Sequence, residues 1–201
     1  DGCTGPEPRD LVVCANGIFD TATGTLLPPN PRFFTFASTT FDYREDAIDC
    51  PNWHKFLFDI WSKAPDQVEA LQEWLGYLLT SDTSAQKMLF LIGPPRAGNV
   101  ISPKLSSLSN NFGLAPLLNK TVALVSDLRL SESLDVHLIV ENMLSITGED
   151  TFTVDRKFLS VVTAKLPTRL VVMSNDLFRN GASSAAIYTR MILLRLTESF
   201  L

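Results

Sequence analysis

A glycine-bounded loop in the middle of the chain has the composition of a phosphate cradle. It comes directly after the apolar run Lys87–Ile92, and four residues separate its outer glycines. In a Gly-x-x-x-x-Gly loop that follows a strand, successive backbone N–H groups can wrap a phosphate. The predicted nucleotide-binding residues are Gly93, Pro94, Pro95, Arg96, Ala97 and Gly98.

The residues after this loop do not suit the same chemistry. A lysine here normally neutralises the β- and γ-phosphates, and a serine or threonine hydroxyl holds Mg²⁺. Asn99 and Val100 stand in these places, and the stretch that follows carries Pro103 and several serines instead of a helical stripe. Either the loop is inactive, or a segment of the intact protein is absent between Gly98 and Asn99. We favour the second alternative, which predicts a chain break at this junction.

Two other apolar runs end in polar side chains. Asp127 follows Thr121–Ser126, and Asn175 follows Arg169–Ser174. The carboxyl ends of parallel strands form the ligand-binding edge of an open α/β sheet, where a carboxylate can hold the Mg²⁺ of a nucleotide. Asp127 is therefore predicted as a catalytic residue and Mg²⁺ ligand. Asn175 is predicted as a catalytic residue that contacts the γ-phosphate, although both residue types are also common in turns.

Three other charged residues are candidates with open alternatives. Glu149, or Glu132 in its place, could orient an attacking water. Arg190 lies shortly before the last apolar run. Its charge could stabilise a transition state on the nucleotide of a neighbouring subunit, or it could cap a helix.

Arg156 and Lys157 belong to the one concentration of basic residues in this acidic chain, together with Lys165 and Arg169. A hairpin that carries Arg156 and Lys157 into the pore of a ring would meet the phosphate backbone of DNA. A solvated surface is the alternative explanation for such a charge cluster.

The elements that would position these residues can be predicted from hydrophobic periodicity. Four apolar runs of strand length suit a sheet that is covered on both faces. A weaker strand is predicted at Val100-Ile101, and a helix over Ser131–Ile146. Strands that alternate with helices indicate a three-layer α/β domain. The four predicted strands are Lys87–Ile92, Thr121–Val125, Arg169–Met173 and Met191–Leu196.

The N-terminal part reads differently. Leu11–Ala15 and Ile18–Asp20 flank Asn16-Gly17, which predicts a β-hairpin. Two amphipathic helices follow. The apolar face of the first is predicted at Trp53, Phe56, Leu57, Ile60 and Trp61, and that of the second at Val68, Leu71, Leu75, Leu78 and Leu79.

Composition limits the possible functions. The chain has 201 residues, of which 45% are hydrophobic, as in a packed globular domain. A net charge of −5 argues against coating nucleic acid by bulk electrostatics, but not against a local basic element. The three cysteines and two histidines lack metal-ligand spacing, so we expect free thiols. No apolar run could cross a bilayer and no export leader is visible, so we expect a cytoplasmic protein without a membrane partner.

Taken together, these motifs resemble the superfamily 3 helicase domain of phage and plasmid primase-helicases, of the satellite-phage and poxvirus type. The resemblance covers nearly the whole chain. In the ATPase part it rests on the loop from Gly93 to Gly98 and on Asn99–Lys120, which is similar to the stretch after the family's first helix. In the N-terminal part it rests on Asn16–Asp20, Thr23-Gly24, Leu27-Pro28, Phe41–Tyr43 and Gly76–Thr80.

The resemblance implies an α/β fold, an AAA+-like three-layer P-loop ATPase with a central parallel sheet. A small β-hairpin and a helical N-terminal region would precede it. The flanking region would span residues 1–82 and the ATPase core residues 83–201, with the missing segment between 98 and 99. ATP and Mg²⁺ would be the cofactors, and single-stranded or forked DNA the partner. The protein would form a homo-oligomeric ring, a hexamer, in a bacterial host cell, with a primase domain or protein beside it.

The family's site roles carry over to single residues. The departures are Asn99, Val100 and Leu128, where a lysine, a hydroxyl and often an acid stand in the family. The resemblance implies an ATP-driven replicative helicase; the alternative is an inactive P-loop module with an interaction or regulatory role in a mobile element. The matched residues are Asp127 (Walker B acid), Asn175 (sensor), Arg190 (arginine finger), and Glu149, Arg156 and Lys157 (the motif whose hairpin touches DNA).

Overall fold

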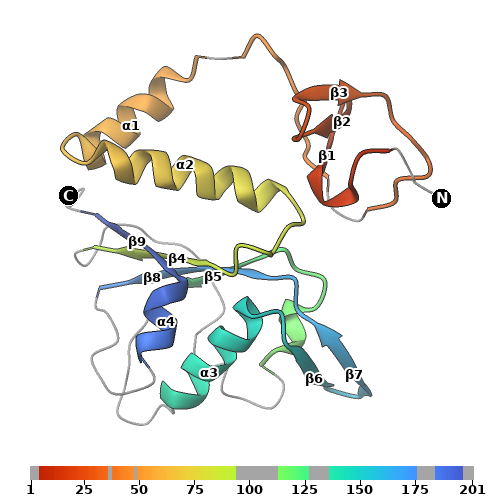
Figure 1. The fold of residues 1–201 in the computed structure, drawn as a ribbon, viewed down its shortest axis with the longest axis vertical. Coiled ribbons are helices and arrows are strands. Elements are labelled where there is room, and N and C mark those ends of the chain that lie inside the picture. Colours follow the sequence, from red (N-terminus) through yellow and green to blue (C-terminus); the bar gives the residue numbers. More distant parts are fainter. Residues whose placement is uncertain are drawn as a thin grey trace.

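Four short apolar strands form a parallel sheet at the centre of the fold (Figure 1). Their order is β5-β8-β4-β9, and each neighbouring pair is parallel. The predicted parallel pairing of these runs is confirmed. The computed structural model describes residues 5–35, 38–47, 49–93, 113–126, 136–175 and 184–196. The strands are β4 (Met88–Ile92), β5 (Val122–Ser126), β8 (Arg169–Ser174) and β9 (Met191–Arg195).

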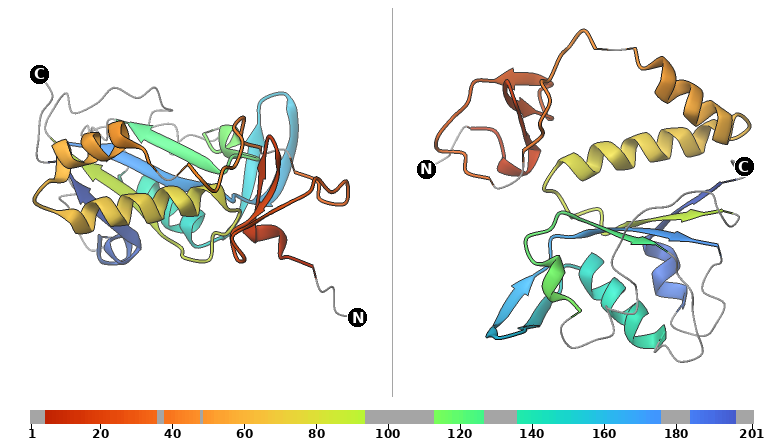
Figure 2. Two further views of the ribbon diagram at one scale, coloured as in Figure 1. Left: turned by 90° about the horizontal axis from the view of Figure 1, so that it is seen from above. Right: turned by 180° about the vertical axis from the view of Figure 1, so that it is seen from behind.

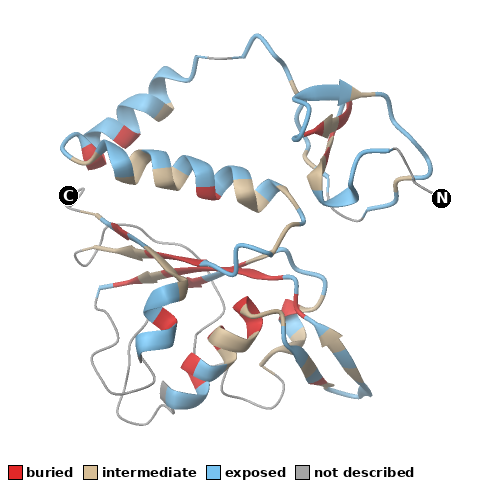
Figure 3. Cartoon of the chain, in the orientation of Figure 1, coloured by how far each residue is buried: buried red, intermediate tan, exposed pale blue. Residues whose placement is uncertain are grey.

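Both faces of this sheet are buried at its two central strands, β4 and β8, which explains why these strands are nearly all apolar. Successive side chains of a strand point to opposite faces. Leu89 and Val171 therefore join one hydrophobic cluster, while Phe90 and Val172 join the other. All four are buried, and Figure 3 colours much of the central sheet as buried. Burial on both faces requires a helical layer on each side of the sheet.

The two helical layers come from different parts of the chain. Helices α1 (Pro51–Trp61) and α2 (Pro65–Leu79) cover one face, and α3 (Val136–Thr147) and α4 (Ser184–Arg190) the other (Figures 1 and 2). Trp61 is buried against the sheet, and its indole Nε1 donates to the carbonyl of Arg195 at 2.7 Å. The predicted three-layer α/β arrangement is confirmed. Helices assigned in the sequence to the flanking region thus share a core with the sheet.

The helix faces that pack on the sheet differ in part from those predicted. In α2 the buried residue is Trp74, whereas Leu75 and Leu79 are exposed. In α1 the predicted Leu57, Ile60 and Trp61 are buried, but Phe56 is exposed and stacks on Trp53 at 5.7 Å between ring centroids. The contact surface of α2 is rotated toward its tryptophan, because that side chain offers more apolar area to the sheet than a leucine.

A second, antiparallel sheet is formed by the N-terminal segment. It consists of β1 (Leu11–Cys14), β2 (Gly17–Asp20) and β3 (Thr25–Leu27), after a short 3₁₀ turn η1 (Pro8–Asp10). The predicted hairpin is confirmed, and β3 is an addition that the sequence did not indicate. Gly17 permits the close approach of β3, because a Cβ at this position would lie 2.6 Å from the carbonyl oxygen of Leu27.

A second hairpin projects from the end of the parallel sheet at which its strands begin. It consists of β6 (Thr151–Arg156) and β7 (Leu159–Lys165), and lies beside a 3₁₀ turn η3 (Ala115–Leu117). Val154, within β6, is buried in the same hydrophobic cluster as the inner residues of α3 and packs the hairpin against this cluster. Seen from above, both hairpins lie at the same end of the molecule (Figure 2). Within the described ranges, no helix is long and apolar enough to cross a membrane.

Candidate functional site

The carboxyl edge of the parallel sheet brings two predicted site residues together. In the β4–β8 register, Ile92 is opposite Ser174, and the N–H of Gly93 donates to the carbonyl of Ser174 at 3.2 Å. Gly93, which opens the predicted phosphate loop, therefore lies beside Asn175, the predicted sensor. This was expected from the two parallel strands that precede these residues.

The third predicted residue of this edge follows β5. Ser126 ends that strand and is opposite Met173 of β8. Asp127 comes next in the sequence but lies outside the described residues, as do Pro94, Pro95, Arg96, Ala97 and Gly98. The magnesium ligand, the phosphate loop and the break predicted after Gly98 therefore stay predictions. The weak strand predicted at Val100-Ile101 lies outside the described residues as well.

Burial changes sharply at this edge. Val172 is fully buried and Ser174 nearly so, whereas Asn175 is exposed. A polar amide thus stands where an apolar strand leaves the core. Such a position at the carboxyl end of a parallel strand is where open α/β sheets bind ligands. The described part of the edge can supply the side-chain amide of Asn175 to an anion.

Glu149 is not part of this edge. Its Oε1 accepts a hydrogen bond from the Thr83 hydroxyl, in the segment before β4. It follows the end of α3, which returns the chain from the carboxyl edge to the amino edge. Because β4 is five residues long, the two edges are separated by roughly 15 Å. The predicted role of Glu149 as the residue that orients water beside Asn175 of its own chain is therefore not supported.

Arg190 also lies at the amino edge, where it caps helix α3. Its Nη1 donates to the carbonyl of Leu144 at 2.7 Å and contacts the hydroxyl of Thr147 at 3.1 Å. Helix capping was the alternative prediction for Arg190, and within a single chain Arg190 makes this contact. This position keeps Arg190 away from Gly93 and Asn175 of its own chain. Its action on a neighbouring subunit stays a prediction.

The β6–β7 hairpin carries the predicted DNA-binding residues. Arg156 is partly buried, and its Nε and Nη2 donate to the carbonyl of Ser160 at 3.0 and 2.7 Å. Its guanidinium therefore closes the hairpin. Lys157 is exposed at the tip, and its Nζ lies 5.1 Å from the centroid of the Phe158 ring. DNA binding by either residue stays a prediction.

Phe158 is the residue of this tip that sequence reasoning missed. It is 92% exposed, more than any other large hydrophobic residue that the structure describes. Its φ angle of 63° places it in the left-handed region, which a bulky residue seldom adopts. An apolar residue directly after a lysine, in the turn between two strands, is the signal that could have found it. The tip therefore offers a cation and an aromatic face together.

Arg169 does not belong to the exposed basic cluster in which the sequence placed it. It is 3% exposed and lies over the ring of Tyr77 at 5.2 Å. Burial lowers the pKa of Arg169, but an arginine stays charged in proteins. Burial, and then the charge of Asp82, raises the pKa of Tyr77. Arg169 is therefore a structural cation of the core.

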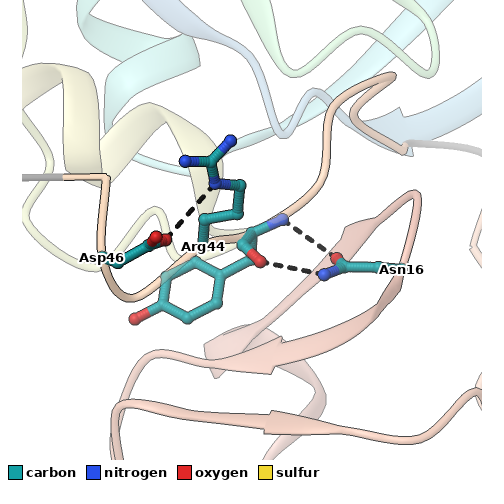
Figure 4. A network of polar contacts seen from close by, with 4 residues as sticks. Asn16, Arg44 and Asp46 are labelled. Atoms are coloured by element: carbon teal, nitrogen blue, oxygen red, sulfur yellow. Dashed lines mark hydrogen bonds and ion pairs between the residues drawn. The ribbon is translucent and has the colours of Figure 1, made fainter.

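A polar network at the N-terminal sheet connects two motifs of the sequence, Asn16–Asp20 and Phe41–Tyr43 (Figure 4). The Asn16 side chain bonds the backbone of Tyr43 twice: Nδ2 donates to the carbonyl at 2.8 Å, and Oδ1 accepts from the N–H at 2.9 Å. The Tyr43 ring stacks on Phe19 at 4.1 Å. Arg44 and Asp46 form an exposed ion pair beside it. These contacts hold the segment after β3 against the sheet and provide no reactive group.

Comparison with known families gives two matches along the chain. A family described as "D5 N terminal like" matches residues 6–62, and a family of unknown function (DUF5906) matches residues 82–186, just over half of the chain. The first match covers four of the five N-terminal motifs of the resemblance described above, from Asn16 to Tyr43, and ends before Gly76–Thr80. It supports the predicted relation to phage and plasmid replication proteins. No curated protein matches the chain.

A solved structure shares the fold. The A-form apo structure of the NrS-1 C-terminal region matches with a TM-score of 0.55 at 12% sequence identity. The alignment covers 71% of this chain but only 37% of that one, so the chain spans little more than a third of the structure it matches. At this identity the likeness concerns the fold.

Proposed function

We propose that this chain, which belongs to the DUF5906 family of unknown function, is the ATP-dependent helicase core of a phage or plasmid replication protein. The "D5 N terminal like" match supports the replication context, and the likeness to the NrS-1 C-terminal region supports the fold. ATP binding, ring formation and DNA translocation are the specific parts of this proposal.

One observation carries it: the Gly93 N–H is bonded to the Ser174 carbonyl at the carboxyl edge. Strand β8 lies between β4 and β5, so Asn175 leaves the sheet between the phosphate loop and the strand that leads to Asp127. This order suits a γ-phosphate held between a backbone cradle and a magnesium ion. Asp127 would hold the Mg²⁺, and Asn175 would contact the γ-phosphate. ATP would supply the phosphoanhydride whose hydrolysis drives translocation.

DNA would bind at the amino edge of the sheet, from which the β6–β7 hairpin projects. Lys157 and Phe158 at the hairpin tip pair a cation with an aromatic face, the combination that single-strand binding surfaces use for phosphates and bases. The guanidinium of Arg156 is bonded within the hairpin and would contribute less. Replacement of Arg156 and Lys157 by glutamate should weaken DNA binding and flatten its salt dependence while leaving the parallel sheet intact. Because Arg156→Glu also removes the bonds that close the hairpin, Lys157→Glu alone should have the same effect on the salt dependence. Unchanged binding would assign this cluster to a solvated surface.

The nucleotide site can be tested through Asn175. Affinity for a fluorescent ATP analogue with Mg²⁺ should fall about tenfold in Asn175→Ala, because a hydrogen bond to a charged group is lost. Asn52→Ala is the matched control, since it removes the same exposed amide from the first turn of α1. Equal affinity of both variants and the wild type would contradict the proposed site.

Asn99 and Val100 favour a second candidate function, that of an inactive P-loop module. If these residues follow Gly98 directly, the loop lacks its lysine and hydroxyl, and the chain would be an inactive P-loop module that binds DNA or protein. Such a module would bind single-stranded DNA without hydrolysing ATP. The sequence or mass of the intact protein across this junction separates the two functions before any assay.

A further inference from the structure

The C-terminus of helix α3 leads directly into the β6–β7 hairpin. The helix ends at Thr147, β6 begins after three intervening residues, and the turn formed by these residues is bonded back to the helix. Gly148 N–H donates to Leu144 O at 2.8 Å, and Asp150 N–H donates to Ser145 O at 3.0 Å. The orientation of the end of α3 therefore fixes the direction in which the hairpin leaves the sheet.

Arg190 is bonded at this junction. Its Nη1 shares the Leu144 carbonyl with the Gly148 N–H and reaches the Thr147 hydroxyl as well. The last carbonyls of a helix have no partner within the helix and carry partial negative charge. The guanidinium of Arg190 adds a second, charged donor to the Leu144 carbonyl and complements the helix dipole. It also links α3 to the start of β9, which follows Arg190 directly.

Gly148 makes room for this guanidinium. A Cβ at position 148 would lie 2.8 Å from Arg190 Nη1 and 3.0 Å from Leu144 O. The side chain that would have to move is the far end of a flexible arginine. Any larger residue at position 148 would therefore displace Arg190 from the carbonyl.

We propose that Arg190 is a positioning residue that holds the root of the β6–β7 hairpin, and that Gly148 is required to admit it. This inference goes further in a second step, which rests on the proposed function. One guanidinium cannot cap α3 and reach a neighbouring subunit's nucleotide at the same time. Engagement of that nucleotide would withdraw the cap and loosen the hairpin root, so that nucleotide state in one subunit changes the DNA-contacting element of the next.

The first step is tested by hydrogen exchange of the full chain, without nucleotide or DNA. Amides in residues 148–156 should exchange about tenfold faster in Arg190→Ala and in Gly148→Ala, because both remove a charge-assisted bond at the root. Arg190→Lys keeps a cationic donor, so its exchange rate should lie between that of these two variants and that of the wild type. Lys87→Met is the matched control: it removes a cation that donates to Thr189 O at 2.7 Å, beside Arg190 but away from α3.

The first step is wrong if exchange at the root is unchanged in both variants, if Lys87→Met raises it equally, or if exchange rises uniformly into β1–β3. The second step adds a non-hydrolysable ATP analogue. Amide exchange in the wild-type hairpin should then approach the rate of Arg190→Ala. The rate of Arg190→Ala should not change when the analogue is added. If calorimetry shows that the analogue binds while the wild-type hairpin stays unchanged, the coupling is wrong. If the analogue does not bind, the proposed function fails and the positioning role of Arg190 stands on the first experiment.

Discussion

Arg169→Met tests whether a single buried cation joins the N-terminal helices to the parallel sheet. Arg169 Nη1 donates to the carbonyls of Tyr77 at 2.6 Å and Asp82 at 3.2 Å, and its Nε to the carbonyl of Thr121 at 3.3 Å. These carbonyls belong to the end of α2, the connection to β4 and the approach to β5. Methionine keeps an unbranched apolar stem at this position and removes all three bonds.

The expected loss of unfolding free energy is the difference between the hydrogen bonds that are lost and the desolvation cost that is removed. Hydrogen bonds to a charged group contribute about 1.5–3 kcal/mol each. Burial of the cation costs several kcal/mol, which the methionine recovers. Arg169 Nη2 also has no acceptor among the described residues, which further reduces the net stabilisation that Arg169 provides. We therefore expect unfolding free energy to fall by about 2–4 kcal/mol, or Tm by roughly 10 °C for a chain of this length.

The assay is thermal and urea unfolding followed by circular dichroism, with Lys165→Met as control. Lys165 is an exposed cation of β7, so its replacement changes the net charge equally without touching the core. The control should stay within about 0.5 kcal/mol of the wild type. If Arg169→Met is as stable as the control, the bonds are offset by desolvation and Arg169 does not hold these elements together.

Four more outcomes are expected. Trp61→Phe should lower the unfolding free energy in urea by about 1 kcal/mol, because a carbonyl of β9 loses its partner. Asn16→Ala should speed proteolysis around Tyr43 and leave the parallel sheet unaffected. Phe158→Ala should weaken single-stranded DNA binding at least fivefold in anisotropy titrations, and unchanged affinity would exclude base stacking. Hydrogen bonds from the following turn lower the pKa of Asp82. Its stabilising contribution is therefore complete above about pH 3.9 and lost as pH falls through the folded pKa, so Asp82→Asn should be less sensitive to acid.

The parallel sheet could be predicted because its strands carry a strong signal. A strand that is buried on both faces must be apolar at nearly every position, as Met88–Ile92 is. Such short runs, alternating with helical patterns, leave few other arrangements. The neighbourhood of Gly93 and Asn175 follows from the same reasoning, since both come directly after parallel strands.

Other features depend on contacts that periodicity does not record. Arg169 looked like a surface cation because the sequence cannot show three carbonyls converging on it. Leu75 and Leu79 were predicted to pack, but the larger Trp74 takes the buried face of α2. Glu149 was grouped with the catalytic residues by its place in a motif. The path of α3 carries it to the other edge, where it meets Thr83.

DNA-stimulated ATP hydrolysis by the intact protein tests the central claim most directly. With Mg²⁺ present, phosphate release should rise on addition of single-stranded DNA and fall at least a hundredfold in Asp127→Asn, because the carboxylate that would hold the metal is lost. The same variant should keep its circular dichroism spectrum and its DNA affinity. No hydrolysis by the wild type at any DNA concentration, with DNA binding retained, would contradict the helicase assignment and favour the inactive module.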